Sequence, residues 1–410
     1  MFSTLSRLMA QTFAALKYYN YRLWFVGQLI SLVGTWMQTT AQGYLVYTLT
    51  NSPRYLGLVS AASGLPSILF TLTAGVIADR MPRRTLLIIT QSAMMVLAFL
   101  QAALTFSGLI QPWHLIVLAA LFGTAQAFDA PTRQSFVLEM VNRQDLTNAV
   151  ALNATMFNLA LVIGPATGGL IYAAVGPAWC FALNGISFIA VIAALLWMRI
   201  RPSETTKHRN SAMSDLLEGL SFVLRHNVLR LLIANIGVFS TLALGMVTLI
   251  PAWAVQILGG DSRTNGYMLS ARGIGAVISA LTLAAIGGKG VRGKIWTLGS
   301  FLLPLCMAAF AWTRVLPLAL VLLAGVGWCF MALANSSNAM VQTLAPDALR
   351  GRVMGIYTLV FFGAMPLGSF LAGELAERLG EPLTVLINTV LLFAFAVLVR
   401  LLAPFVWRLE

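Results

Sequence analysis

The chain has 410 residues, of which 59% are hydrophobic and only 10% are charged. In a soluble globular protein about one quarter of the residues are charged. This composition therefore excludes a soluble globular protein and indicates a membrane protein. The formal net charge of +13 would suit a nucleic-acid-binding protein, but the basic residues gather in the segments between long apolar runs, and we expect no nucleic acid partner.

Twelve apolar runs are long enough to cross a bilayer as helices, because a helix rises about 1.5 Å per residue and the hydrocarbon core is about 30 Å thick. In chain order, the first six are approximately Leu23 to Tyr47, Leu56 to Ala78, Thr85 to Phe106, Trp113 to Phe136, Asn148 to Val175 and Trp179 to Met198. The second six are approximately Leu231 to Val255, Tyr267 to Gly287, Ile295 to Trp312, Leu316 to Val341, Val353 to Ala376 and Leu383 to Leu402. We therefore predict an all-α membrane protein with twelve transmembrane helices.

The basic residues predict the orientation of these spans. Only four of the 26 Lys and Arg residues lie in the connecting segments on one side of the membrane, namely Arg54, Arg263, Arg314 and Arg378. Positive charge collects on the cytoplasmic side, so we expect both termini in the cytoplasm and a multi-pass protein of the inner, cytoplasmic membrane. The first apolar run is long enough to span, and we expect no removable signal peptide.

The two halves of the chain resemble each other. A shift of 209 residues superimposes Gly57 on Gly266, Gly64 on Gly273, Arg80 on Lys289, Gln126 on Asn335 and Asp129 on Asn338. A duplicated six-helix unit explains this offset, and duplicated bundles are typical of transporters whose halves rock about a shared site. We predict two pseudo-symmetric six-helix bundles, over residues 1–199 and 226–410, joined by a cytoplasmic linker over residues 200–225.

The stretch "GVIADRMPRR" places an acid and three arginines between spans 2 and 3. It resembles motif A of the major facilitator superfamily, with Pro82 standing where the motif has its second glycine. The resemblance implies that the motif residues latch the two halves and control the conformational change: Gly75, Asp79, Arg80, Arg83 and Arg84. The alternative is a loop that only follows the positive-inside rule.

The stretch "GPATGG" inside span 5 resembles motif C, which is associated with the antiporter branches of the same superfamily. Its positions are occupied by Gly164, Pro165, Gly168 and Gly169. Pro165 removes a backbone donor and bends the helix, while the glycines allow close helix packing. The alternative is an ordinary kinked, glycine-rich membrane helix.

The resemblance covers the whole chain. "GQLISLVGTWMQTTAQGYLVYTLTNSP" and "FDAPTRQSFVLEMVNRQDLTNAVALN" are similar to the branch of macrolide efflux proteins and enterobactin-type siderophore exporters. This implies a secondary active transporter that exports small amphiphilic molecules by alternating access, in exchange for protons, as a monomer in the lipid bilayer. Many members of the branch carry an acid at the position of Thr35, and its absence here argues against a proton-coupling role for span 1. A lipid or nutrient carrier of the same fold is the alternative.

Polar side chains within the spans are candidates for contact with cargo. In span 1, five of them recur at spacings of three and four residues and share one helical face: Gln28, Ser31, Thr35, Gln38 and Gln42. Such a face lines a wet cavity or forms hydrogen bonds to another helix. In this superfamily spans 1, 4, 7 and 10 face the cavity, which implies a further set of lining residues: Gln126, Asn235, Asn335 and Asn338.

Two charged positions inside spans have alternative interpretations. Asp129 and Arg133 are four residues apart in span 4, which suits an ion pair that is either part of a gate or coupling step or purely structural. Arg272 is the lone strong charge well inside span 8, about 10 Å from its predicted outer end. It either snorkels to the membrane surface or faces the cavity and favours anionic cargo.

An enzyme would need clustered catalytic or metal-binding groups. The histidines His114, His208 and His226 are scattered, the cysteines lie inside spans, and there is no phosphate-binding loop of the type G-x-x-x-x-G-K-[ST]. We therefore expect a transporter with no cofactor and no metal site, and not a polytopic membrane enzyme.

Overall fold

The computed structural model describes residues 13–199, 212–286 and 291–404, and in these ranges the chain is helical without strands. A short 3₁₀ helix, η1 (Ala14–Lys17), precedes the first long helix. The long helices of the first half are α2 (Tyr19–Thr50), α3 (Pro53–Arg80), α4 (Arg83–Phe106), α5 (Pro112–Val137), α6 (Leu146–Val175) and α7 (Pro177–Trp197). Those that follow are α8 (Ala212–Arg225), α9 (Asn227–Thr248), α11 (Ser262–Ile286), α12 (Arg292–Trp312), α13 (Leu316–Leu344), α14 (Arg350–Leu379) and α15 (Glu381–Leu402).

Ten helices in the described ranges are long and apolar enough to cross a membrane. They are α4 to α7, the α9 region and α11 to α15. Helices α2 and α3 have 32 and 28 residues but are not among the ten. In α2, the hydropathy is lowered by the five polar residues of the face predicted above, which we call the polar stripe. Large apolar side chains are widely exposed on the outer surface, for example Leu69, Trp312 and Leu401, as expected of a protein surrounded by lipid.

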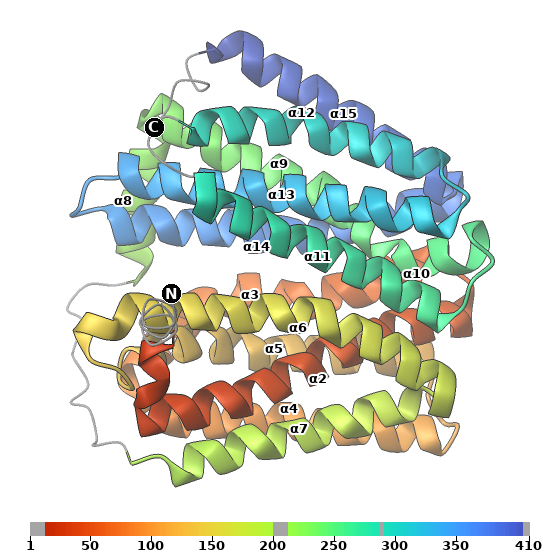
Figure 1. Cartoon of the computed structure of the whole chain (residues 1–410), viewed down its shortest axis with the longest axis horizontal. Helices are drawn as coiled ribbons and strands as arrows, with labels where there is room; N and C mark the ends of the chain where they lie inside the picture. The colour runs from red at the N-terminus through yellow and green to blue at the C-terminus, as the bar shows by residue number, and fades with distance from the viewer. Residues whose placement is uncertain (1–12, 200–211, 287–290, 405–410) are drawn as a thin grey trace, which may run out of the picture.

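The helices form two groups (Figure 1), one of α2 to α7 and the other of α8 to α15. Within the first, α2 packs on α6 and α7, and α4 packs on α5 and α7. Within the second, α11 and α12 pack on α13, and α9 packs on α14. The two groups meet along two seams, α3 against α14 and α6 against α11.

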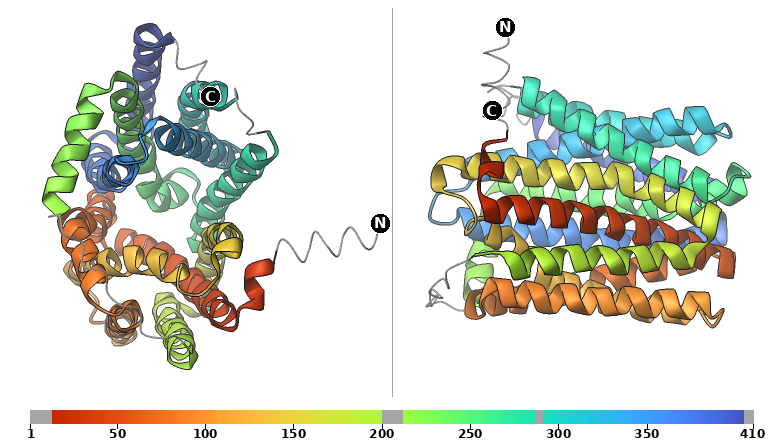
Figure 2. Two further views of the ribbon diagram at one scale, coloured as in Figure 1. Left: turned by 90° about the vertical axis from the view of Figure 1, so that its left-hand side faces the viewer. Right: turned by 60° about the horizontal axis from the view of Figure 1, so that its bottom comes forward.

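The two ends of the molecule differ. Helix α8 lies at one end, which we call the linker end, and runs across the ends of the other helices (Figure 2, left). At the other end, which we call the α10 end, the chain from α9 is interrupted by α10 (Ile250–Ala252) and the π-helix η3 (Trp253–Ile257). The single span predicted from Leu231 to Val255 is present as one apolar span, Asn227–Ile257, and the irregular turns after Thr248 were not predicted.

Proline marks the starts of most of the long helices that begin at the α10 end, with α11 as the exception. The first or second position of α3, α5, α7, α13 and α15 is occupied by Pro53, Pro112, Pro177, Pro317 and Pro382 respectively. The first turn of a helix has no partner for its N–H groups, and proline has the helical φ already built in. The chain therefore turns sharply before α3, which brings the first turn of this helix beside α14 of the opposite group.

Glycine allows the helices to approach closely within each group. A Cβ atom on Gly123 of α5 would overlap the carbonyl of Ser63 on α3, and one on Gly275 of α11 would overlap the carbonyl of Ala324 on α13. Close backbone approach through small residues is the usual way that membrane helices associate. Each group is therefore tightly packed, and large side chains such as Trp24 and Trp253 are fully buried inside.

Candidate functional site

The first seam joins α3 to α14 through a glycine pair near the α10 end. A Cβ atom on Gly373 would lie 2.9 Å from the Cα atom of Gly57. Next to this contact, the Ser52 hydroxyl donates to Glu377 at 2.6 Å and the Arg54 guanidinium pairs with Glu374 at 3.1 Å. The seam is thus closed by backbone contact and by polar groups at its rim.

The second seam joins α6 to α11 in the same way. A Cβ atom on Gly266 would lie 3.1 Å from the Cα atom of Gly169, and the Ser262 hydroxyl donates to the carbonyl of Gly169 at 3.1 Å. Farther along, the Ser270 hydroxyl donates to the carbonyl of Val162 at 2.6 Å. Gly57 and Gly266, which the 209-residue offset aligns, therefore make equivalent contacts on opposite seams.

The contacts between the groups run from the α10 end to about the middle of α3, where Gly64 packs against Pro366 and Ile68 against Gly363. At the linker end, glycines of the same helices face open space, because a Cβ atom on Gly75 of α3 or on Gly355 of α14 would meet nothing within 4 Å. Helix α8 supports this end from the side, where Gly219 packs against Arg352 and Glu218 forms an ion pair with the same arginine at 2.6 Å.

The motif C residues of α6 contact both groups. Gly164 and Gly168 lie against α2, where added Cβ atoms would meet Trp36 and the backbone of Met37. Gly169 lies against α11, and the carbonyl of Pro165 is 2.5 Å from a Cβ atom built on Gly266. Helix α6 continues through Pro165 from Leu146 to Val175, so the motif forms a smooth surface between its own group and the other one.

The motif A residues surround the turn between α3 and α4 at the linker end. Helix α3 ends at Arg80 and Pro82 is the N-cap of α4, which shows how the chain accommodates proline in place of the second glycine. Arg83 forms an ion pair with Glu139, just after α5, and Arg84 donates to the carbonyl of Leu196 on α7 at 2.8 Å. Arg80 is exposed, and the side chain of Asp79 lies outside the described residues.

The polar stripe of α2 lies largely inside the first group. Gln28, Ser31, Gln38 and Gln42 are buried, and only Thr35 is partly exposed. The Gln42 amide donates to the carbonyl of Leu115 on α5 at 3.2 Å. Of the two interpretations of this stripe, the described state shows hydrogen bonding between helices for Gln38 and Gln42.

Gln38 belongs to a buried amide network that the spacing of polar residues along α2 did not predict. Its amide group donates to Gln101 on α4 at 3.1 Å, and its carbonyl accepts from Asn184 on α7 at 2.7 Å. The Ser187 hydroxyl donates to Asn184 at 3.0 Å. The signal that would have found it is the presence of Gln101 and Asn184 in otherwise apolar spans.

Asp129 is nearly fully buried at the packing surface between α5 and α4. It accepts hydrogen bonds from Thr90 at 3.0 Å and Gln91 at 2.8 Å, and Arg133 lies 3.7 Å away, so the predicted ion pair is present. Its carboxylate is therefore satisfied inside the first group. Gln126, one turn earlier, is half-buried.

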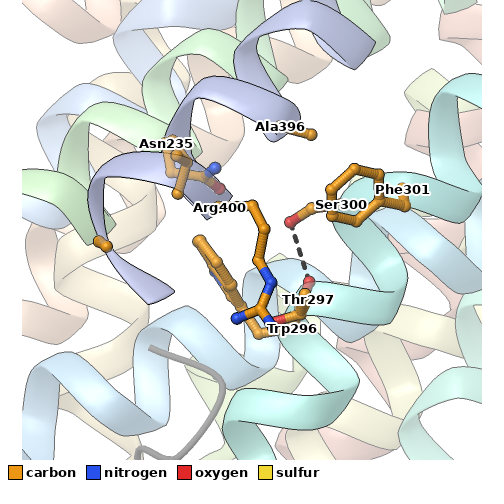
Figure 3. Close-up of a pocket in the computed structure, with 9 residues that line it drawn as sticks. Asn235, Trp296, Thr297, Ser300, Phe301, Ala396 and Arg400 are labelled. Atoms are coloured by element: carbon orange, nitrogen blue, oxygen red, sulfur yellow. Dashed lines mark hydrogen bonds between the residues drawn. The ribbon is translucent and has the colours of Figure 1, made fainter. Parts of the chain in front are cut away.

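The three asparagines of the second group are in different surroundings. Asn235 is fully buried and lines a pocket of about 10 Å³ with Trp296, Ser300 and Arg400 (Figure 3). A cavity of that size holds one water molecule at most. On α13, Asn335 is exposed, while Asn338 is half-buried and accepts a hydrogen bond from Gln342 at 2.7 Å.

Arg272 is the eleventh residue of the 25-residue helix α11. It therefore lies about 15 Å from the α10 end of that helix, deeper than the predicted 10 Å, because the helix starts at Ser262 and not near Tyr267. Its Nε atom is buried without a hydrogen-bond partner. In the described part of the chain, no three His, Cys, Asp or Glu residues are grouped as metal ligands would be.

Comparison with solved structures shows the fold. The structure of the nucleoside transporter NupG matches with a TM-score of 0.75 at 13% identity, over 93% of this chain and 98% of that one. A bacterial homolog of the human lysosomal transporter Spinster matches with a TM-score of 0.67 at 12% identity, over 95% and 96% of the two chains.

Comparison of sequences shows the family. A family model described as transmembrane secretion effector matches residues 10–406. The multidrug efflux pump Tap of Mycolicibacterium fortuitum is 30% identical over 85% of this chain and 87% of its own length. The staphyloferrin A transporter of Staphylococcus aureus is 24% identical (88% and 90%), and the enterobactin exporter EntS of Shigella boydii is 27% identical (88% and 86%). The chain therefore belongs to the transmembrane secretion effectors of the major facilitator superfamily, in the drug and siderophore exporter branch, and is a multi-pass transporter of small molecules and not an enzyme.

Proposed function

We propose that this protein exports small amphiphilic molecules of the drug or siderophore type by alternating access. The observation that carries the proposal is the pair of matched seams, in which Gly57 meets Gly373 and Gly169 meets Gly266. Two groups of helices that touch through smooth glycine surfaces at one end can rock as rigid bodies about a site between them.

The proposed topology places twelve spans in two six-helix bundles, with α2 and α3 crossing the membrane in addition to the ten apolar helices. The bundles comprise residues 1–199 and 226–410, with the linker over residues 200–225. The distribution of basic residues supports an inner-membrane protein with the linker end and both termini in the cytoplasm. In that orientation the described state is closed toward the outside.

We assign conformational control to the two motifs and to the polar groups near the linker end. Gly75, Asp79, Arg80, Arg83 and Arg84 would tie the start of α4 during the rocking motion. Gly164, Pro165, Gly168 and Gly169 would carry the sliding contact of α6, and Asp129 with Arg133 would hold α5 against α4. Exchange with protons is supported by the resemblance to antiporter motif C, and we propose that the protein works as a monomer.

For contact with cargo we favour the partly exposed candidates Thr35, Gln126, Arg272, Asn335 and Asn338. We propose structural roles for Gln28, Gln38, Gln42 and Asn235, because these are buried inside one group. Gln38 and Gln42 are in addition hydrogen-bonded between helices, and an amide held in this way rigidifies its bundle and is not free to bind a passing molecule.

Flux measurements on purified protein in vesicles test the proposal. The panel would contain a macrolide and a catecholate siderophore, each with and without an imposed pH gradient, and protein-free vesicles would be the control. Movement that depends on the protein and increases with the gradient would support proton-coupled export. Gradient-independent movement would remove the proton coupling, and accumulation in intact cells would favour the alternative of a nutrient or lipid carrier.

A further inference from the structure

Arg272 lies well inside α11, one of the helices that are long and apolar enough to cross a membrane. Helix α11 runs from Ser262 to Ile286, so this arginine is about 15 Å from one end and about 21 Å from the other. Fifteen ångströms is nearly three helical turns. Arginines that snorkel lie near helix ends, so this depth argues against snorkelling as the way its charge is solvated.

The side chain of Arg272 is on the helix face away from the lipid. The outer face of α11 is marked by exposed aliphatic residues, Ile274, Ile278 and Leu281. A step of 100° per residue places Arg272 about 160° away from Ile274 around the helix. A further face, with Gly266 and Ser270, packs on α6. Arg272 therefore projects away from the lipid and from α6, on the side of α13, where its own carbonyl touches Gly327, and the residue is partly exposed.

Arg272 shares this face with two other polar residues that have no partners. Asn265 and Ser279 are seven residues before and after it, and positions seven apart in a helix nearly superimpose. Both amide atoms of Asn265, the Nε of Arg272 and the Oγ of Ser279 are buried without a hydrogen-bond partner. Burying such groups unpaired costs free energy, and native structures rarely do so without a reason.

The buried charge of the first group, Asp129, is paired, whereas in the described part of the chain Arg272 is not. Asp129 has three polar neighbours within 4 Å, including Arg133. Arg272 takes part in no ion pair found among the described residues. A guanidinium at membrane depth needs an anion, and a carboxylate matches its planar, two-pronged donor geometry.

We infer that Arg272 recognises a carboxylate on the transported molecule, so that the cargo belongs to the class of amphiphiles that carry a carboxylate. This inference rests on the proposed function, because the cargo must enter between the groups to reach α11. Asn265 and Ser279 are fully buried, so Arg272, which is partly exposed, is the residue of this face that is open to the cargo.

The test compares two probes that differ in one group. One is a fluorescent amphiphile with a carboxylate, and the other is its primary amide; both are measured as flux in vesicles containing the intact protein. Arg272→Gln should lower the flux of the carboxylate probe at least about tenfold, since hydrogen bonds to charged groups contribute about 1.5–3 kcal/mol. The flux of the amide probe should change less than about twofold, and Arg272→Lys should be intermediate for the carboxylate.

The matched control is Arg263→Gln, which removes an exposed arginine from the first turn of the same helix. It should leave both probes unaffected. Equal loss of both probes in properly folded Arg272→Gln, or no loss in either Arg272 variant, would overturn the inference. If the wild-type protein moves the amide but not the carboxylate, the export proposal stands and the carboxylate assignment fails. If the wild-type protein moves neither probe, the export proposal and the carboxylate assignment both fail.

Discussion

Gly169 and Gly266 meet backbone to backbone across the seam between α6 and α11, where a Cβ atom on either would lie 3.1 Å from the Cα of the other. Gly169 also faces the carbonyl of Ser262 so closely that a side chain there must displace it. We expect Gly169→Ala to destabilise the state closed at the α10 end by about 1–3 kcal/mol, the usual cost of overpacking. Transport should fall because the cycle requires this state.

Spin labels at Ser107 and Val315, which are exposed at the α10 end on different groups, would measure the opening. The distribution of distances should shift toward longer values in Gly169→Ala. Gly355→Ala is the matched control, since an added Cβ there meets nothing within 4 Å. An unchanged distribution in Gly169→Ala would show that this seam is not limiting for closure.

The ion pair between Arg54 and Glu374 predicts a smaller effect at the other seam. Its side chains are 55% and 25% exposed, so the pair should contribute at most about 1 kcal/mol. We expect Arg54→Gln and Glu374→Gln each to increase the open population no more than about fivefold, and the double variant to add little. The same pair of spin labels measures this, and fully additive effects would show that the two side chains act separately.

The two seams differ in the charged residues at their rims. The 209-residue offset places Arg263 at the position of Arg54, but Arg263 pairs weakly with its own neighbour Asp261, at 3.9 Å, and not across the seam. The polar closure of the α6 seam instead comes from the Ser262 hydroxyl and the carbonyl of Gly169. Charge-removing variants at Arg263 should therefore not change the distances between the spin labels.

The buried network around Gln38 predicts a loss of stability. Gln38→Leu removes both the donor to Gln101 and the acceptor from Asn184, which are 1% and 0% exposed. Leaving such groups unpaired costs about 1–3 kcal/mol each. We expect a clearly lower Tm of the purified protein in detergent. Thr39→Val is the control, because this exposed hydroxyl bonds only to its own helix, and an equal Tm in both variants would contradict the network's role.

Particular residues show what the sequence could predict. The helices and their order follow from the apolar runs, because only a helix satisfies its own backbone in lipid. The offset that aligned Gly57 with Gly266 anticipated their equivalent contacts. The glutamines of α2 were correctly grouped on one face, but periodicity does not say whether a polar face meets water or another polar helix. Asn184, far away in the sequence, decides this for Gln38.

Depth was harder to predict than the choice of face. The first turn of α11, Ser262 to Asn265, is polar and was left outside the predicted span, so Arg272 lies farther from the start of its helix than predicted. Similarly, Asn227 to Ile257 is one apolar span, as predicted, but its hydropathy does not reveal that the helix changes to the π-helix η3 near its end. Both differences arise because hydropathy reports the solvent around a residue and not the path of the backbone.

The ion pair between Arg83 and Glu139 links the start of α4 to the chain just after α5, with side chains 27% and 17% exposed. If this tie is what motif A contributes, Arg83→Gln and Glu139→Gln should slow vesicle flux to a similar extent, and the double variant should be no slower than either, because residues in one pair are not additive. Arg143→Gln is the control, since Arg143 is exposed at the same end of the molecule and is not part of motif A. A drop in flux with Arg143→Gln as large as with Arg83→Gln would indicate that the total positive charge of this end matters, and not the specific contact with Glu139.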